Sequence, residues 1–319
     1  MNMRRIRMNY DFKLIALDID GTLITSHYTI TARTRKALRA AMDSGMKVTI
    51  ATGRFYHSAR HIARSIGINA PLVCNDGALI KDVSTGKTSF FKPLPMEIAR
   101  DILWIASKYR SFKVQIFMED YKIFAGKDYR RTQIGRFIRF SRRYSAVGCY
   151  NYLRDFVFVP VKNAGNLTGA VEIMKEPPAK IVIYADPDEL DIFKKELTEK
   201  FGDSIFLTTA IKNTVDILNG EVSKARGLAV LAESLGIKRE EIIAIGDNIN
   251  DMLMLEYAGL GVAMGNAQEM VKNRADYVTA GNDEDGIALF VEKLLQNEVG
   301  QRERIIVARK GLSHSEPPF

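Results

Sequence analysis

The stretch Leu14-Ile15-Ala16-Leu17-Asp18-Ile19-Asp20-Gly21-Thr22-Leu23 decides the fold of this chain. Its apolar run indicates a buried parallel strand, and two carboxylates one residue apart follow at the carboxyl end. Open α/β sheets bind their ligands at that edge. Because neighbouring carboxylates repel each other, the pair favours a bound cation, and Mg²⁺ prefers hard oxygen ligands together with a phosphate. A strand that simply ends in a turn rich in Asp and Gly is the alternative at this point.

A strand that ends in a polar, glycine-containing group recurs twice in the next sixty residues. A strand predicted over residues 46–51 ends at Thr52-Gly53-Arg54, and one over residues 72–74 ends at Asn75-Asp76-Gly77. Amphipathic helices are predicted between these strands. The alternation is typical of a doubly wound, parallel (Rossmann-like) sheet and therefore of the α/β class.

The pattern changes in the middle of the chain and then returns. Between residues 88 and 218, paired strands with intervening helices predict an inserted α+β module. The strand–helix rhythm resumes at Gly220, with Lys224 at the start of a helix and Gly246-Asp247 at the end of a strand. We therefore predict a discontinuous core of residues 10–84 and 215–297, an α+β cap of residues 85–214, and a mobile C-terminal tail of residues 298–319.

Composition is that of a soluble globular protein. Of the 319 residues, 46% are hydrophobic and 26% charged, and no apolar run approaches the roughly 20 residues that cross a bilayer. The basic start lacks the apolar region and cleavage site of a signal peptide, so we expect a cytoplasmic protein without a membrane partner. Cys74 and Cys149 are too few to stabilise a fold of this size by disulfide bonds, and their spacing is not that of metal ligands.

The formal net charge of +8 is concentrated partly in the arginine-rich segment 130–143, where Ile134, Phe137 and Ile138 are interleaved. A basic amphipathic helix can lie on nucleic acid or on a membrane. More often, such a helix packs its apolar stripe and leaves its arginines in solvent. We expect the second arrangement, and hence no nucleic-acid partner.

Four stretches at strand or helix ends together resemble the motifs of the haloacid dehalogenase-like hydrolases: Asp18-x-Asp20, Thr52-Gly53-Arg54, Lys224 and Gly246-Asp247-x-x-Asn250-Asp251. The similarity is greatest to the Cof-type phosphatases, which carry a large α+β (C2B-type) cap between the second and third motifs. It covers roughly residues 12–297.

The resemblance implies a role for each motif residue. Asp18 would be the nucleophile that forms an aspartyl-phosphate, and Asp20 the acid and base for the leaving group and the attacking water. Mg²⁺ would be held by the Asp18 carboxylate, the Asp20 backbone carbonyl and Asp247, with Asp251 orienting Lys224 or a water at the metal. The residues expected to bind the substrate are Thr52 and Lys224 on the phosphoryl oxygens, Asn250 on the phosphoryl group, and Gly53, Arg54, Asn75, Asp76 and Gly77 toward the leaving group.

The sequence thus predicts a Mg²⁺-dependent phosphatase of small phosphorylated metabolites such as sugar phosphates or phosphorylated cofactors, acting as a monomer or homodimer. Two alternatives remain open: a non-catalytic or regulatory binding protein that acts through its basic cap, and a phosphosugar mutase. An intact acid pair and the presence of Lys224 favour the phosphatase.

Overall fold

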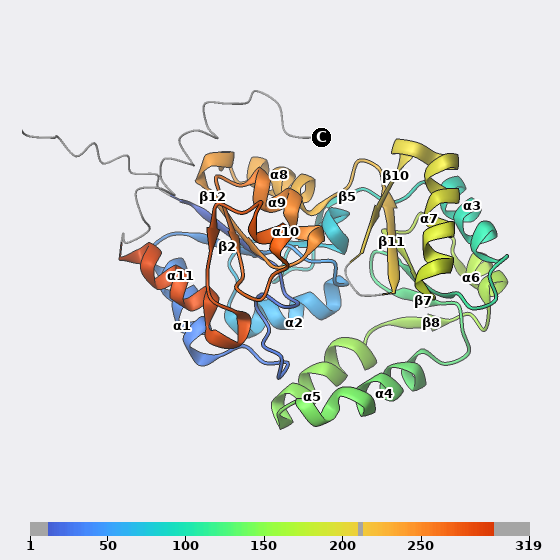
Figure 1. Ribbon diagram of the computed structural model, residues 1–319, viewed down its shortest axis with the longest axis horizontal. Coiled ribbons are helices and arrows are strands. Elements are labelled where there is room, and N and C mark those ends of the chain that lie inside the picture. Colours follow the sequence, from blue (N-terminus) through green and yellow to red (C-terminus); the bar gives the residue numbers. More distant parts are fainter. Residues whose placement is uncertain (1–11, 210–212, 297–319) are drawn as a thin grey trace, which may run out of the picture.

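The structure of the chain, a computed structural model, describes residues 12–209 and 213–296. It contains a parallel α/β core and an α+β module that lies beside it (Figure 1). The tail predicted for residues 298–319 lies outside the described residues.

Strand β1 (Leu14–Leu17) lies inside the core sheet, between two parallel neighbours. The sheet has five parallel strands in the order β14-β13-β12-β1-β2. The other strands of this sheet are β2 (Lys47–Ile50), β12 (Ile242–Gly246), β13 (Leu260–Ala263) and β14 (Tyr277–Val278), and of these β2 and β12 flank β1. Because Leu17 is paired with Ile245, the residues that follow β1 and the residues that end β12 meet at one edge of the sheet.

Helices cover both faces of this sheet, because successive side chains of β1 point to opposite sides. Ile15 and Leu17 pack in a cluster with α1 (Ala32–Asp43), α2 (Tyr56–Ile66) and α11 (Gly286–Leu295). Leu14 and Ala16 pack on the other side with α8 (Lys224–Ser234) and α9 (Met252–Tyr257), near the short helix α10 (Glu269–Lys272). The predicted α/β class and doubly wound core are confirmed.

A small antiparallel sheet extends the core beyond β2. Strand β3 (Leu72–Cys74) reaches the end of β2 through one parallel bridge, between Ala51 and Val73. Strand β4 (Leu79–Lys81) pairs antiparallel with β3, and β5 (Thr88–Phe91) pairs antiparallel with β4.

The module is built on a six-stranded sheet in the order β10-β11-β9-β6-β7-β8. Its strands are β6 (Lys113–Phe117), β7 (Lys122–Phe124), β8 (Val161–Asn163), β9 (Lys180–Tyr184), β10 (Ile205–Thr208) and β11 (Thr214–Asn219). The paired strands expected in this part of the chain form two hairpins, β6 with β7 and β10 with β11. One face of the sheet packs against α3 (Met96–Ala106), α6 (Leu167–Ile173) and α7 (Pro187–Phe201), and the other face lines a cavity described below.

The strand pairing indicates where the chain passes from the core to the module and back. Strand β5 pairs with β4 of the core, and β11 pairs with β9 of the module. We therefore propose that the module begins after residue 91 and ends near residue 219, in place of the predicted limits at 85 and 214.

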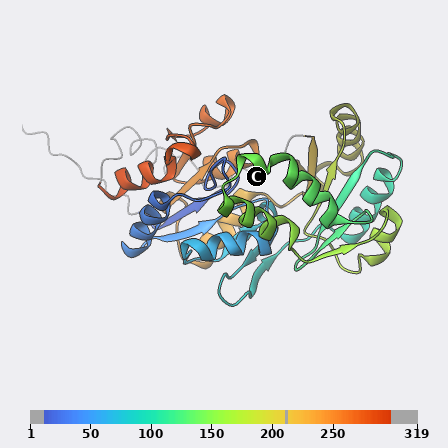
Figure 2. The same ribbon diagram turned by 90° about the horizontal axis from the view of Figure 1, so that it is seen from below.

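The basic segment folds as α4 (Tyr129–Phe140), followed by α5 (Ala146–Tyr152) and a π-helical turn (Leu153–Val157). Figure 2 shows these green helices across the junction of core and module. Helix α4 buries Tyr129 and Gln133, whereas Ile134 and Ile138 are 42% and 66% exposed. The expectation that this helix packs its apolar stripe is therefore wrong for both isoleucines.

Within residues 12–209 and 213–296, none of the helices combines the length and the apolar character that crossing a bilayer requires.

Candidate active site

Asp18 follows the last residue of β1 and points to the side of the sheet that helix α8 covers. Its Oδ1 lies 2.7 Å from Nζ of Lys224, the first residue of that helix. Ser223 begins the helix, with its side chain accepting a hydrogen bond from the Arg226 N–H. The same ammonium lies 2.6 Å from Asp251 Oδ1, so one buried cation holds two buried carboxylates.

A cluster of three carboxylates surrounds the end of β1. Asp18, Asp247 and Asp251 each offer an oxygen within 4.8 Å of the other two. Burial raises the pKa of Asp247 to about 7. The negative charge of Asp251 adds to this shift, and a hydrogen bond donated by Thr22 opposes it. Burial also raises the pKa of Asp18, and the neighbouring carboxylates add to this shift while Lys224 opposes it. Three carboxylates beside a single ammonium leave negative charge in excess, and their oxygens fit a hard divalent cation.

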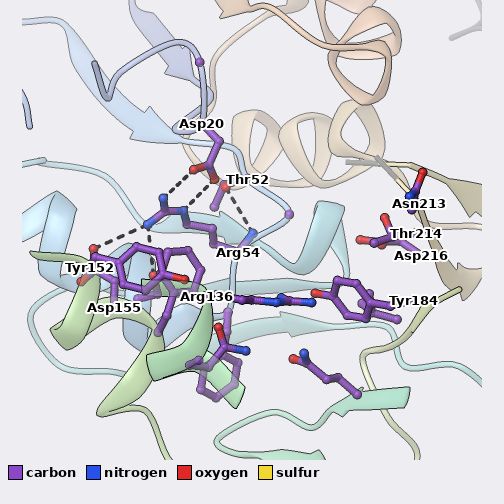
Figure 3. Close-up of a pocket in the computed structure, with 18 of the residues that line it drawn as sticks. Asp20, Thr52, Arg54, Arg136, Tyr152, Asp155, Tyr184, Asn213, Thr214 and Asp216 are labelled. Carbon is purple, nitrogen blue, oxygen red and sulfur yellow. Dashed lines mark hydrogen bonds and ion pairs between the residues drawn. The ribbon is translucent and has the colours of Figure 1, made fainter. Parts of the chain in front are cut away.

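Asp20 lies outside this cluster and faces the loop after β2. Arg54 binds both of its carboxylate oxygens, at 2.7 and 2.5 Å (Figure 3). Desolvation raises the pKa of Asp20, but the Arg54 guanidinium outweighs this effect and the pKa is lowered overall. Nη1 of Arg54 also lies 3.5 Å from Asp155, a fully buried residue of the π-helical turn. Asp155 thus links the module to the core arginine.

The loops after β2 and β3 hold each other through the backbone. The Asp76 N–H donates to the Thr52 carbonyl, and the Asn75 N–H donates to the Arg54 carbonyl. Asn75 and Asp76 both have positive φ, at 50° and 53°, which non-glycine residues rarely adopt. Among the residues that the structure describes, neither polar atom of the buried Asn75 amide has a hydrogen-bond partner. Strain and unpaired polar atoms of this kind concentrate at functional sites.

Asp76 connects the core to the module. One of its oxygens accepts a hydrogen bond from Asn250, and the other lies 2.8 Å from Nζ of Lys180. Lys180 begins strand β9 and also lies 2.6 Å from Asp216 of β11. A Cβ at Gly53 would lie 2.8 Å from the Asp76 carboxylate, so the close approach of these loops requires glycine at that position.

A cavity of about 1080 Å³ opens above Asp18 and Asp20 and extends to the inner face of the module sheet. The core contributes Thr52, Gly53, Arg54 and Asn250 to its wall, and the module contributes Lys122, Arg136 and Tyr184. In Figure 3, Arg136 extends toward Tyr184 on the far side of the cavity from Asp20.

The structure brings the sequence-predicted residues together to different degrees. Asp18, Asp20, Thr52, Gly53, Arg54 and Asn250 line the cavity, while Lys224, Asp247 and Asp251 lie around Asp18. Asn75, Asp76 and Gly77 are buried and do not line the cavity, so their contact with a leaving group stays a prediction. The Asp20 carboxylate faces Arg54, and a role for its backbone carbonyl at a metal also stays a prediction.

Sequence reasoning missed four residues that the module supplies. Lys122, Arg136, Asp155 and Asp216 belong to none of the four motifs. Asp216 carried one signal, since it interrupts the apolar strand Val215-Asp216-Ile217-Leu218 and a charge inside a buried strand needs a partner.

Comparisons with known proteins agree with this geometry. A family model described as haloacid dehalogenase-like hydrolase matches residues 15–291. Phosphatase YwpJ of Bacillus subtilis is 30% identical over 89% of this chain and 100% of its own length. The B. subtilis 5-amino-6-(5-phospho-D-ribitylamino)uracil phosphatase YitU is 30% identical over 88% of this chain and 96% of its own.

A solved haloacid dehalogenase-like hydrolase from B. subtilis superposes with a TM-score of 0.75 at 28% identity, covering 88% of this chain and 99% of that one. The match of the family model spans most of the chain and includes every residue placed around Asp18 above. The chain therefore belongs to the haloacid dehalogenase-like hydrolases.

Proposed function

We propose that this protein is a Mg²⁺-dependent phosphatase that hydrolyses small phosphorylated metabolites through a phosphate ester of Asp18. The observation that carries the proposal is the buried Asp18 carboxylate, held 2.7 Å from the Lys224 ammonium beside two further acids at the floor of a cavity. The names of YwpJ and YitU, both phosphatases, support the reaction class.

The reaction divides between two aspartates. An Asp18 oxygen attacks the phosphorus in line, the phosphorus–oxygen bond to the leaving group breaks, and the leaving oxygen takes a proton from Asp20. Water then attacks the phosphorus of the aspartyl-phosphate and gives a proton to Asp20, and the bond between phosphorus and the Asp18 oxygen breaks, which regenerates the carboxylate and releases inorganic phosphate. Thr52 and Lys224 would hold the phosphoryl oxygens during both steps.

The metal site would consist of Asp18, Asp247 and Asp251, with the Asp20 backbone carbonyl as a further ligand. A bound Mg²⁺ would supply positive charge that offsets the charge developing on the phosphoryl oxygens. Asn250, whose Oδ1 is buried without a partner, would contact the phosphoryl group.

Arg54 controls when Asp20 can act. As long as both Asp20 oxygens accept hydrogen bonds from the guanidinium, the carboxylate stays ionised and has no proton to give. Asp155, 3.5 Å from Nη1 of Arg54, offers this arginine a second carboxylate. We therefore propose that Arg54 turns from Asp20 toward Asp155 and the substrate before the leaving oxygen is protonated.

The test of the nucleophile is Asp18→Asn with p-nitrophenyl phosphate as substrate. We expect kcat to fall by about 10³-fold or more, since an amide cannot form the covalent ester. Asp203→Asn, a change in the turn after α7 and outside the cavity, is the matched control and should retain activity. Turnover by Asp18→Asn at the rate of the unsubstituted protein would exclude Asp18 as the nucleophile.

The metal requirement is tested separately by chelation. Treatment with EDTA should abolish turnover, and added Mg²⁺ should restore it, because three carboxylates around Asp18 would otherwise repel the phosphate. Full activity in EDTA would overturn the proposed ligand set. Phosphate release from a panel of phosphomonoesters, measured as kcat/KM, would then separate the phosphatase from the phosphosugar mutase, which transfers phosphate to sugar.

A further inference from the structure

The inner face of the module sheet carries polar side chains that the proposed reaction does not use. Strand alternation turns Val114, Ile116 and Ile123 toward the helices of the module, where all three are buried in its apolar core. The same alternation turns Gln115, Phe117 and Lys122 toward the cavity, and all three line it. Lys122 is paired with Phe117 across the β6–β7 hairpin, so a buried lysine lies beside an aromatic ring on this wall.

Helix α4 turns its polar side to the same space. Tyr129, Gln133 and Arg136 lie on successive turns of the helix and line the cavity, while Ile134 and Ile138 face solvent. An amphipathic helix that buries glutamine and exposes isoleucine reverses the usual arrangement. Phe137 of the same helix still packs against the apolar core, but the burial of Gln133 in place of the two isoleucines points to a polar ligand inside the cavity.

The buried cations among the described residues differ in whether a carboxylate lies near them. Arg54, Lys81, Lys180 and Lys224 each lie within 4.0 Å of at least two carboxylates. Lys122, which is 5% exposed, has no carboxylate at ion-pair distance among the described residues. Buried charges are ordinarily paired, and the protein does not provide the partner here.

Aromatic rings surround the Lys122 ammonium instead. Nζ lies 4.3 Å from the ring centre of Phe117, 5.6 Å from that of Phe55 and 5.9 Å from that of Tyr129. Ring faces attract a cation but carry no net negative charge. Burial, together with the positive charges of Lys180 and Arg54, lowers the pKa of Lys122 to about 7, and the negative charge of Asp216 opposes this shift. An anion bound beside the ammonium would restore its charge.

Two buried amides complete the wall. Gln115 and Gln133 are 4% and 3% exposed and line the cavity, and neither side chain makes a hydrogen bond to any part of the chain that the structure describes. Their N–H₂ groups can donate to a bound oxygen atom. Lys122, Gln115 and Gln133 therefore face one space with neither an ion pair nor a side-chain hydrogen bond to the described residues.

We propose that this wall of the cavity binds a second anionic group of the substrate, a carboxylate or a second phosphate, and that Lys122 is its principal ligand. The inference rests on the proposed function, because it places the scissile phosphate at Asp18 and the second anion at the opposite wall of the same cavity. Gln115 and Gln133 donate hydrogen bonds to the second anion. The leaving group is thus a chain or ring that ends in a negative charge.

The test measures binding in the Asp18→Asn background, where the substrate stays intact. The ligands are phosphate monoesters of ω-hydroxyalkanoic acids of increasing length, the methyl esters of the same acids, and the bisphosphates of the matching diols. We expect the best acid or bisphosphate to bind at least about tenfold more tightly than the methyl ester, the effect of one charge-assisted contact. The acid and bisphosphate arms distinguish a carboxylate site from a second phosphate site.

Four variants test whether Lys122 causes this difference in affinity between the charged ligands and the methyl ester. Lys122→Met should reduce the ratio of acid or bisphosphate to ester affinity to about one, and Lys122→Arg should retain part of it. Lys162→Met is the matched control, because Lys162 also lies over an aromatic ring, at 3.9 Å from that of Tyr121, but outside the cavity; it should keep the full ratio. Gln133→Leu, expected to lower the ratio by a smaller factor, is a second variant that leaves Lys122 in place.

Equal binding of acid, bisphosphate and ester, no binding of any of them, or an unchanged ratio in Lys122→Met would each overturn the second-anion site. These outcomes are separate from failure of the proposed function, which would appear as absent turnover of every phosphomonoester by the unsubstituted protein.

Discussion

At the scale of single residues, the buried charge of Lys122 should make the stability of the protein depend on pH. The pKa of this lysine falls from 10.5 to about 7 on folding. Between these values the unfolded chain binds more protons than the native protein, so the free energy of unfolding rises with pH through that window. The rise attributable to Lys122 is at most about 1.4 kcal/mol per pH unit, and it is lost as pH falls toward 7.

Urea unfolding of the unsubstituted protein and of Lys122→Met between pH 7 and pH 9.5 checks this expectation. The variant should be the more stable protein near pH 7, and the difference should shrink as pH rises. Lys162→Met should follow the unsubstituted protein throughout. A stability difference that does not change with pH would show that Lys122 keeps its proton in the native protein.

The residues around Asp18 could be predicted from the sequence because each follows a strand or begins a helix. Strand pairing then brings the segments together at one edge of the sheet. Asp20 shows where this reasoning ends: β1 stops at Leu17, so strand alternation does not fix the direction of its side chain, which turns to Arg54. Asp155 and Lys122 could not be predicted, since their positions depend on how the module folds over the core.

At the scale of elements, the turn Asn75-Asp76-Gly77 should tolerate no side chain at its last position. Gly77 has φ of +104°, and a Cβ there would overlap the carbonyl of Ser223, which precedes helix α8. Gly45 has a similar φ of +98° but open space around it. Gly45→Ala should therefore cost about 1–2 kcal/mol from the backbone conformation alone, and Gly77→Ala should cost clearly more.

Chemical denaturation of both variants measures this difference, and activity adds a second readout. Gly77→Ala has to displace the start of α8, which carries Lys224, so kcat should fall together with stability. Gly45→Ala should leave kcat unchanged. Equal losses of stability in the two variants would mean that the Ser223 backbone moves freely.

Secondary structure was predicted well where apolar periodicity and end signals agreed. The strands predicted over residues 46–51 and 72–74 correspond to β2 (Lys47–Ile50) and β3 (Leu72–Cys74). Helix α4 was predicted as a helix, and Phe137 of its apolar stripe packs against the core, but Ile134 and Ile138 are exposed because the side with Gln133 and Arg136 faces the cavity. The π-helical turn (Leu153–Val157) was not predicted.

At the scale of the whole molecule, Lys180 holds the module against the core. Its ammonium lies between Asp76 of the core and Asp216 of the module, and all three side chains are buried. Burial raises the pKa of Asp216 while Lys180 opposes that shift. Removal of the cation would leave two buried carboxylates without a counter-charge, a much larger cost than the loss of an exposed ion pair.

Lys180→Met should therefore lower the free energy of unfolding by about 3–5 kcal/mol, in contrast to the gain expected for Lys122→Met near pH 7. Thermal and urea unfolding would measure both variants. Lys108→Met, which removes the exposed pair with Glu196, is the control and should cost less than about 1 kcal/mol. Because the double variant Lys180→Met/Asp216→Asn leaves one buried charge fewer, it should recover part of the loss. A Lys180→Met protein as stable as the control would show that the core and the module are joined mainly by their apolar contacts.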